Sequence, residues 1–260
     1  NIVELIEFLK TLDLYHGPPD KEQTDIYDQI KMIMDYIPPN ITVKNLSLKY
    51  NQYSLYASLL VKEIRVLNPQ DKNAIDFNLK TEAKLAYGKS INSSGNIEFN
   101  GSITQRLDDS FVNINLANFT QGKFKLNKLN FLASYKEEKL SLRSVQNVIP
   151  MLVDFTYDTK ANEADLKLQT QNLSPNSIFS SVSDKNLLNK IKNVSITNSA
   201  SLRYKLKEEA FSYSSSGKVY VPETLVPGSL TADYSLAGDD KALNLNTFKI
   251  DGNNYSGQAS

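Results

Sequence analysis

The sequence predicts a mainly β protein: an elongated, curved antiparallel β-meander with short N-terminal helices and a small helical insertion. Hydrophobic and polar residues alternate over runs of thirteen to seventeen residues, which is the period of strands with one buried face. Short polar connections separate these runs, whereas parallel strands need crossovers of a dozen or more residues. The chain has only 10 Gly and 9 Pro in 260 residues, few for the frequent turns of a β-sandwich.

The pattern of residues 1–39 is that of two amphipathic helices that would cap one end of the sheet. Hydrophobic residues at helical spacing predict a first helix, which ends before the segment 16–19 because its two prolines remove backbone donors and fix φ. A second helix is predicted over about 21–36, and Pro38 ends it. Its apolar stripe comprises Ile26, Ile30, Ile33, Met34 and Ile37.

Residues 40–260 are predicted to form the sheet, interrupted by a helical insertion near 174–192. Phase changes in the alternation predict β-bulges near Asn45, Lys62 and Asn127, because one extra residue turns every later side chain to the other face. In the insertion, hydrophobic residues follow near-helical spacing after Ser174 and Pro175, a pair that is typical of a helix start. One or two short helices are expected there.

Short acidic segments lie between alternating runs at 107–110, 136–139, 207–210 and 238–241. Turn tips favour Asp and solvated charge, so these segments predict hairpin turns. Their spacing fits neither a calcium-binding EF-hand loop nor a pair of carboxylates that face one cleft. The chain also lacks a Gly-x-Ser-x-Gly elbow and a phosphate-binding glycine loop. We therefore expect no enzymatic activity.

The composition excludes further classes of function. The chain has 29 basic and 29 acidic residues, a formal net charge of zero, so nucleic acid is not an expected partner. With no cysteine and only one histidine, His16, neither a metal site nor a cofactor is expected. No run of residues reaches the roughly 18 apolar residues that a membrane helix needs.

The remaining feature is the apolar face of the predicted sheet, which is rich in aromatic residues because the chain has 14 Tyr and 11 Phe. A sandwich would bury such a face against a second sheet, whereas long twisted strands favour one curved sheet with a concave apolar side. From the alternation alone, the candidate lining is Ile75, Phe77, Leu79, Leu85, Ile97, Phe99, Ile103, Phe131, Met151, Val153, Phe155, Leu166, Leu168, Val194, Ile196, Leu202, Tyr204, Phe211, Tyr213, Val219, Leu230 and Tyr234.

Three segments resemble the AsmA-like proteins, in particular the TamB family of bacterial envelope proteins. They are the helix end and first strand at 37–48, the alternating segment 97–103, and the strand–Gly–strand pattern at 248–257. The resemblance extends over most of the chain. It implies a taco-like sheet with a hydrophobic groove that carries phospholipid acyl chains between the bacterial inner and outer membranes. The helical segments at 1–37 and 174–192 depart from a uniform groove.

The same resemblance implies a location in the bacterial periplasm, within a parent protein anchored in the inner membrane. An Omp85-type outer-membrane barrel is an implied partner. The chain begins with Asn1 and ends within the start of another strand at 255–260, so we expect it to be a segment of a longer protein.

Two alternatives to the lipid conduit stay open at this stage. A surface or structural β-sandwich, such as an adhesin domain, would close the apolar face into a dry core, and phospholipid would not change its melting. An outer-membrane barrel ranks third, because its aromatic residues would form two girdles, whereas Tyr and Phe are scattered along these strands.

Overall fold

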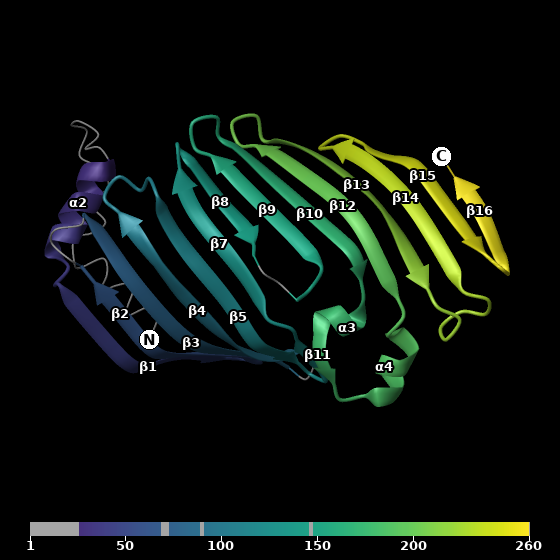
Figure 1. The fold of residues 1–260 in the computed structure, drawn as a ribbon, viewed down its shortest axis with the longest axis horizontal. Helices are drawn as coiled ribbons and strands as arrows, with labels where there is room; N and C mark the ends of the chain where they lie inside the picture. Colours follow the sequence, from purple (N-terminus) through teal and green to yellow (C-terminus); the bar gives the residue numbers. More distant parts are fainter. Residues whose placement is uncertain (1–25, 69–72, 89–90, 146–147, 260) are drawn as a thin grey trace.

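The computed structural model describes residues 26–68, 73–88, 91–145 and 148–259. In this part of the chain all strands belong to one antiparallel sheet, which is open and curved (Figure 1). The predicted fold class is therefore confirmed. The strands are β1 (Asn40–Gln52), β2 (Leu55–Leu67), β3 (Ala74–Tyr87), β4 (Ile91–Thr104), β5 (Ser110–Gln121), β6 (Phe124–Leu126), β7 (Leu129–Lys136), β8 (Lys139–Ser144), β9 (Met151–Asp158), β10 (Glu163–Leu173), β11 (Phe179–Val182), β12 (Ser195–Lys205), β13 (Ala210–Val221), β14 (Leu230–Asp239), β15 (Leu243–Gly252) and β16 (Tyr255–Ala259).

The order of the strands in the sheet follows the sequence, apart from β6 and β11, which pair with each other beside the main path. The predicted meander is thus correct. The acidic segments lie at hairpin turns: Lys136 pairs with Lys139, and Lys205 with Ala210. In the turn after β14, the Asp239 carboxylate accepts hydrogen bonds from the backbone N–H groups of Lys241 and Ala242. These bonds hold the pKa of Asp239 below its ordinary value, so a turn-forming role accounts for this acidic residue.

The bulge predicted at Lys62 is present, because Lys62 is the extra residue of β2 relative to β3. At Asn45 the register shows no bulge between β1 and β2: Lys44 pairs with Glu63 and Leu46 with Val61 without a shift. Asn45 therefore lies opposite Lys62, and the phase change crosses both strands. The φ of Asn45 is +58°, a left-handed conformation that Asn adopts more readily than other non-glycine residues. This phase change returns the hydrophobic residues of β1 and β2 to one side of the sheet.

The bulge predicted near Asn127 is wrong, because the chain breaks there into two separate strands. β6 ends at Leu126 and pairs with β11, whereas β7 begins at Leu129 and pairs with β8. The backbone N–H of Asn127 donates to the Ile178 carbonyl at 2.8 Å, and its side-chain amide donates to the Ser177 carbonyl at 2.7 Å. The phase change therefore marks the point where the chain bonds to the inserted helix.

The insertion contains α3 (Pro175–Ile178) and α4 (Lys185–Ile191), and Ser174 precedes the first as its N-cap. Between them lies β11, which the sequence pattern did not predict. We call the pair β6 and β11 the strap, since it joins two segments on either side of β7–β9 (Figure 1). The ring centroids of Phe124 and Phe179 lie 4.9 Å apart across it, with the ring planes tilted by 37°, and Lys123 pairs with the α4 N-cap Asp184 at 3.4 Å.

At the other end of the sheet, α2 (Ile26–Tyr36) lies beside the first strands (Figure 1). The amide of Asn68, just after β2, donates to the carbonyls of Met34 and Ile37 at 2.8 and 2.7 Å. Met34 is buried. The first predicted helix and the side chains of Ile26, Ile30 and Ile33 lie outside the described part of the chain.

We expect Asn45→Val to destabilise the protein by about 1–2 kcal/mol, because a β-branched residue cannot adopt the left-handed φ of Asn45 without strain. Urea denaturation should show a lower midpoint. Ser47→Val is the matched control: it lies in the same strand without a positive φ, and valine favours strands. Equal stability of the two variants would contradict the proposed strain at Asn45.

The contact of α2 with the sheet predicts that Met34→Asp lowers the free energy of unfolding by about 2–4 kcal/mol, because it buries an unpaired charge. Met32 provides the control, since it lies on the same helix with 56% of its surface exposed, and Met32→Asp should change stability by less than about 0.5 kcal/mol. Thermal melting of both variants measures the difference. A melting temperature unaltered by Met34→Asp would contradict the packing of Met34 against the sheet.

Candidate functional site

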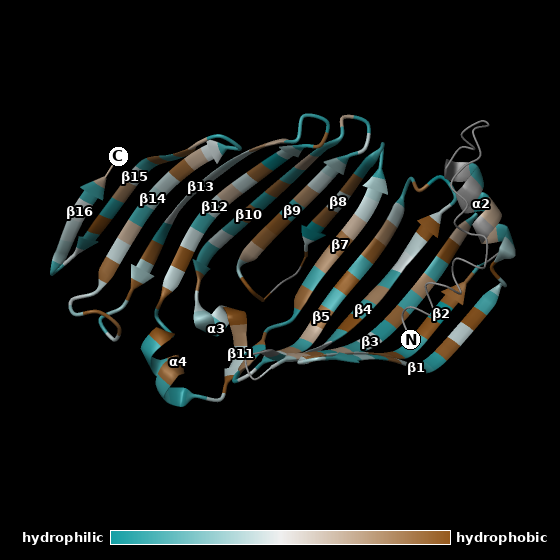
Figure 2. Ribbon diagram, turned by 180° about the vertical axis from the view of Figure 1, so that it is seen from behind, coloured by the Kyte–Doolittle hydropathy of each residue, from teal (hydrophilic) through white to brown (hydrophobic). Residues whose placement is uncertain are grey.

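Strand register assigns the side chains of the sheet to two faces. Ile75, Phe77 and Leu79 of β3 point to one side of the sheet, which we call the apolar face. In the other strands, the residues that pair across the sheet with these positions belong to the same face. The opposite side is the polar face. One row of the apolar face crosses the sheet through Ile41, Val66, Phe77, Gly101, Val112, Ala133, Leu142, Phe155, Leu166, Leu202, Tyr213, Gly238 and Leu243. Figure 2 shows the resulting alternation of hydrophobic and hydrophilic positions along the strands.

The structure places the predicted lining residues together on this apolar face, with one exception. Their cross-strand pairs, such as Leu79 with Phe99 and Phe155 with Leu166, link them from β3 to β14. The exception is Val194, which precedes β12 and donates its N–H to the Ile191 carbonyl at 2.9 Å. Val194 belongs to the end of the α4 segment, so its assignment to a strand was wrong.

Further residues on the apolar face were missed by the sequence analysis. A bulge that the sequence analysis did not predict concealed some of them, because the alternation changes phase between Leu245 and Phe248. Others lie in the short strand β8, whose six residues give a weak pattern. The missed residues include Ile41, Val43, Leu46, Leu48, Val61, Ile64, Val66, Val112, Ile114, Leu116, Leu140, Leu142, Leu236, Leu243, Leu245, Phe248 and Ile250.

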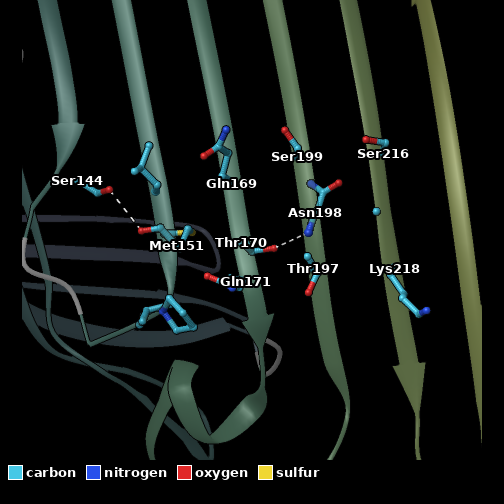
Figure 3. A pocket seen from close by; sticks show the side chains of 14 residues that line it. Ser144, Met151, Gln169, Thr170, Gln171, Thr197, Asn198, Ser199, Ser216 and Lys218 are labelled. Atoms are coloured by element: carbon cyan, nitrogen blue, oxygen red, sulfur yellow. Dashed lines mark hydrogen bonds between the residues drawn. The ribbon is translucent and has the colours of Figure 1, made fainter.

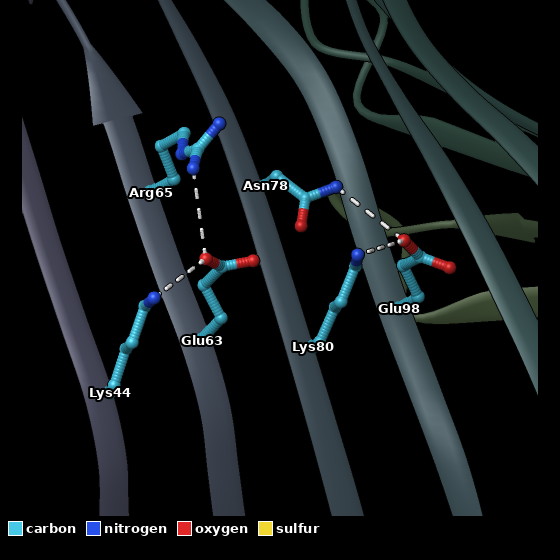
Figure 4. A network of polar contacts seen from close by, with 6 residues as sticks. All are labelled: Lys44, Glu63, Arg65, Asn78, Lys80 and Glu98. Carbon is cyan, nitrogen blue, oxygen red and sulfur yellow. Dashed lines mark hydrogen bonds and ion pairs between the residues drawn. The ribbon is translucent and has the colours of Figure 1, made fainter.

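Charge is segregated completely between the two faces of the described strands. By register, none of their Lys, Arg, Asp or Glu side chains belongs to the apolar face. On the polar face, Glu63 pairs with Lys44 at 3.9 Å and with Arg65 at 3.8 Å (Figure 4). Lys80 pairs with Glu98 at 3.8 Å in the neighbouring strands (Figure 4). Such partly exposed pairs contribute little stability individually, but they show that this face is suited to water.

The apolar face lacks a covering layer over most of the described sheet. The buried hydrophobic side chains of the described residues are Met34, Val61, Ile75, Ile149 and Val182, and none of these residues has less than 5% of its surface exposed. On the apolar face of β12 and β13, Leu202 and Phe211 are 39% and 38% exposed. Hydrophobic side chains of this size are normally buried in a folded protein. A contiguous exposed apolar surface of this kind marks a site of interaction.

Aromatic rings lie flat on the apolar face over glycines of the neighbouring strands. Gly95 is covered by the ring of Phe119, and Gly238 by Tyr213. Gly217 pairs with Tyr234, whose hydroxyl lies 3.0 Å from the position of a Cβ on that glycine. Because glycine has no side chain, it leaves room for the neighbouring ring to cover the exposed backbone. These pairs place large aromatic side chains close to the backbone of the neighbouring strand.

A cavity of about 830 Å³ lies over β9, β10, β12 and β13 (Figure 3). Several residues that line it belong by register to the polar face, among them Gln169, Gln171, Ser199 and Lys218. Others belong to the apolar face, namely Met151, Thr170, Asn198 and Gly217, so the cavity overlaps the predicted lining at Met151. Its amide and hydroxyl groups suit water rather than hydrocarbon.

No group of three or more His, Cys, Asp or Glu residues in the described part of the chain is placed to hold a metal ion. Among the helices that the structure describes, none combines the length and the hydrophobicity needed to cross a membrane. The chain matches no family model, no curated protein and no solved structure. The resemblance to AsmA-like proteins therefore stays a prediction.

The close approach of strands at Gly217 predicts that Gly217→Ala destabilises the protein by about 1–3 kcal/mol. The added Cβ would lie 2.5 Å from the Thr197 carbonyl oxygen and 3.0 Å from the Tyr234 hydroxyl. Gly257 is the control on the same face, because a Cβ there meets no atom within 4 Å. Urea denaturation should separate the two alanine variants, and equal midpoints would contradict the role of Gly217.

Proposed function

We propose that the chain is a non-enzymatic segment of a lipid conduit, in which phospholipid acyl chains move along the apolar face of the curved sheet. The observation that supports this proposal is the apolar face itself: it contains no charged side chain in the described strands and no layer covers most of it. A β-sandwich with a closed core requires a second sheet, whereas the described strands form one.

The energetics of transfer favour an open apolar surface for this task. Each CH₂ group of a lipid tail gains about 0.8 kcal/mol when it leaves water for apolar surface. Conduction requires binding along many similar positions rather than at one tight site, and the mainly hydrophobic rows of the apolar face provide such positions. A polar headgroup would stay in water beyond the groove, so the proposed transport needs no catalytic motif.

The route and the partners belong to the same proposal and rest on the resemblance alone. We propose that the segment works in the bacterial periplasm, within a parent protein anchored in the inner membrane, and carries phospholipid between the inner and outer membranes. An Omp85-type outer-membrane barrel is the proposed protein partner. The sheet is curved, and we propose that its apolar face lies on the inner side of the curve, where a lipid tail would be shielded from water.

Photo-crosslinking tests whether lipid contacts the apolar face. A photoreactive amino acid at Phe99, on the apolar face, should form adducts with phospholipid when the purified chain is mixed with vesicles of phosphatidylethanolamine and phosphatidylglycerol. Position 100 provides the control, because Asn100 is the next residue of β4 and faces the polar side, where it accepts a hydrogen bond from Asn113. Mass spectrometry should detect adducts at position 99 but not at position 100.

A charge on the apolar face tests transport. Phe99→Asp should keep the circular dichroism spectrum, because water already reaches the half-buried side chain. It should reduce lipid transfer between vesicles at least tenfold, since each passing tail meets a hydrated carboxylate. Asn100→Asp is the control and should leave transfer unchanged. Unfolding by Phe99→Asp together with a lack of lipid adducts would instead support a closed, dry core and refute the conduit.

A further inference from the structure

One row of the apolar face contains several side chains with polar groups. It passes from Met151 through Thr170, Asn198 and Gly217 to Tyr234, in strands β9, β10, β12, β13 and β14. The adjacent rows on both sides are mainly hydrophobic, because they pass through Ile196 and Val219 on one side and Leu168 and Ala200 on the other. A polar side chain surrounded by hydrophobic rows requires an explanation, since its solvation is reduced there.

Hydrogen bonds fix the orientation of Asn198 in this row. The Tyr234 hydroxyl donates to Asn198 Oδ1 at 2.7 Å, and the Ser215 hydroxyl donates to the same oxygen at 3.0 Å. The backbone N–H of Asn198 donates to the Thr170 hydroxyl at 3.0 Å. Thr170 is 8% exposed, so this side of the network is shielded from water. The carboxamide is therefore held by its oxygen.

The nitrogen of the same carboxamide is the group that can bind a ligand. Within the described part of the chain, Asn198 Nδ2 donates to no protein acceptor, although the group has two N–H donors. A ligand that complements it must have an oxygen acceptor with hydrocarbon on both sides, because hydrophobic rows flank Asn198. No charged side chain of the apolar face is available to neutralise a phosphate, so a neutral acceptor fits better.

We propose that Asn198 binds the ester carbonyl of a glycerolipid whose tail lies along the apolar face. This inference rests on the proposed function and adds a position at which the moving lipid is recognised. Seven residues of β12 follow Asn198, a distance of about 23 Å at 3.3 Å per residue. One leaflet of a bilayer has a hydrocarbon depth of about 15 Å, so one tail fits along this part of the strand. The headgroup then lies toward the start of β12, where the sheet ends.

Binding of matched diester and diether phospholipids tests the proposal, because the two lipids share their headgroup and tails and differ only in the ester carbonyls. The unmodified chain should bind the diester about fivefold more tightly than the diether, as expected for the loss of one hydrogen bond. Asn198→Leu should lower diester affinity to the diether value and leave diether affinity unchanged. Asn244→Leu, on the polar face of β15, should retain the fivefold ratio.

A second variant keeps the test informative if Asn198→Leu does not fold. Asn198→Asp preserves an oxygen acceptor for Tyr234 and Ser215 but removes both N–H donors, and its ratio of diester to diether affinity should fall to about one. Equal affinity of the unmodified chain for the two lipids would overturn the role of Asn198 and leave the conduit intact. An unchanged ratio in either Asn198 variant would do the same. Binding of neither lipid would overturn both proposals.

Discussion

The segregation of charge to one face of the sheet is the constraint on which the other features of this structure depend. Side chains alternate with period two, so a single inserted residue would send every later charge to the apolar face. Local corrections at Asn45, Asn118 and Asn172 prevent this, and all three residues have φ values near +50° to +60°. Asparagine supports this backbone conformation at low cost. The long apolar face exists because these local corrections occur within long strands.

Stability in such a sheet arises mainly between neighbours. The extensive contacts of each described strand are those with the adjacent strands, together with the contacts of the strap. Few described side chains are buried, so backbone ladders and lateral contacts between side chains replace the close-packed interior of a globular domain. A sheet of this kind can expose a hydrophobic surface and stay folded, because its folding does not depend on burying that surface completely.

The alternation of residues was sufficient to predict the meander and the side to which most lining residues point. Phe77, Phe155 and Tyr213 lie in different strands, yet period-two spacing alone assigned each to the correct face. The phase change at Asn45 was also predictable, because Val43 and Leu46 could share a face only if one residue was extra. Local periodicity is informative wherever the partner of a strand is its neighbour in sequence.

Long-range pairing was not predictable in the same way. The bond between Asn127 and Ile178 and the pairing of β6 with β11 join residues about fifty positions apart, and no local signal specifies such a partner. The hydrogen bonds of Asn198 were missed for a similar reason. Its contacts with Tyr234 and Ser215 depend on the register of three strands, which alternation within one strand does not specify.

The strap has a mechanical consequence for the sheet. A single-layer sheet, in which each strand contacts only its neighbours, bends easily about axes parallel to the strands. The strap adds a second connection between β5 and the segment that follows β10, which closes a ring of hydrogen-bonded backbone around β7–β9. Bending at these strands would have to stretch that ring. We therefore expect the middle of the sheet to be its stiffest part and the strands on either side of it to bend more easily.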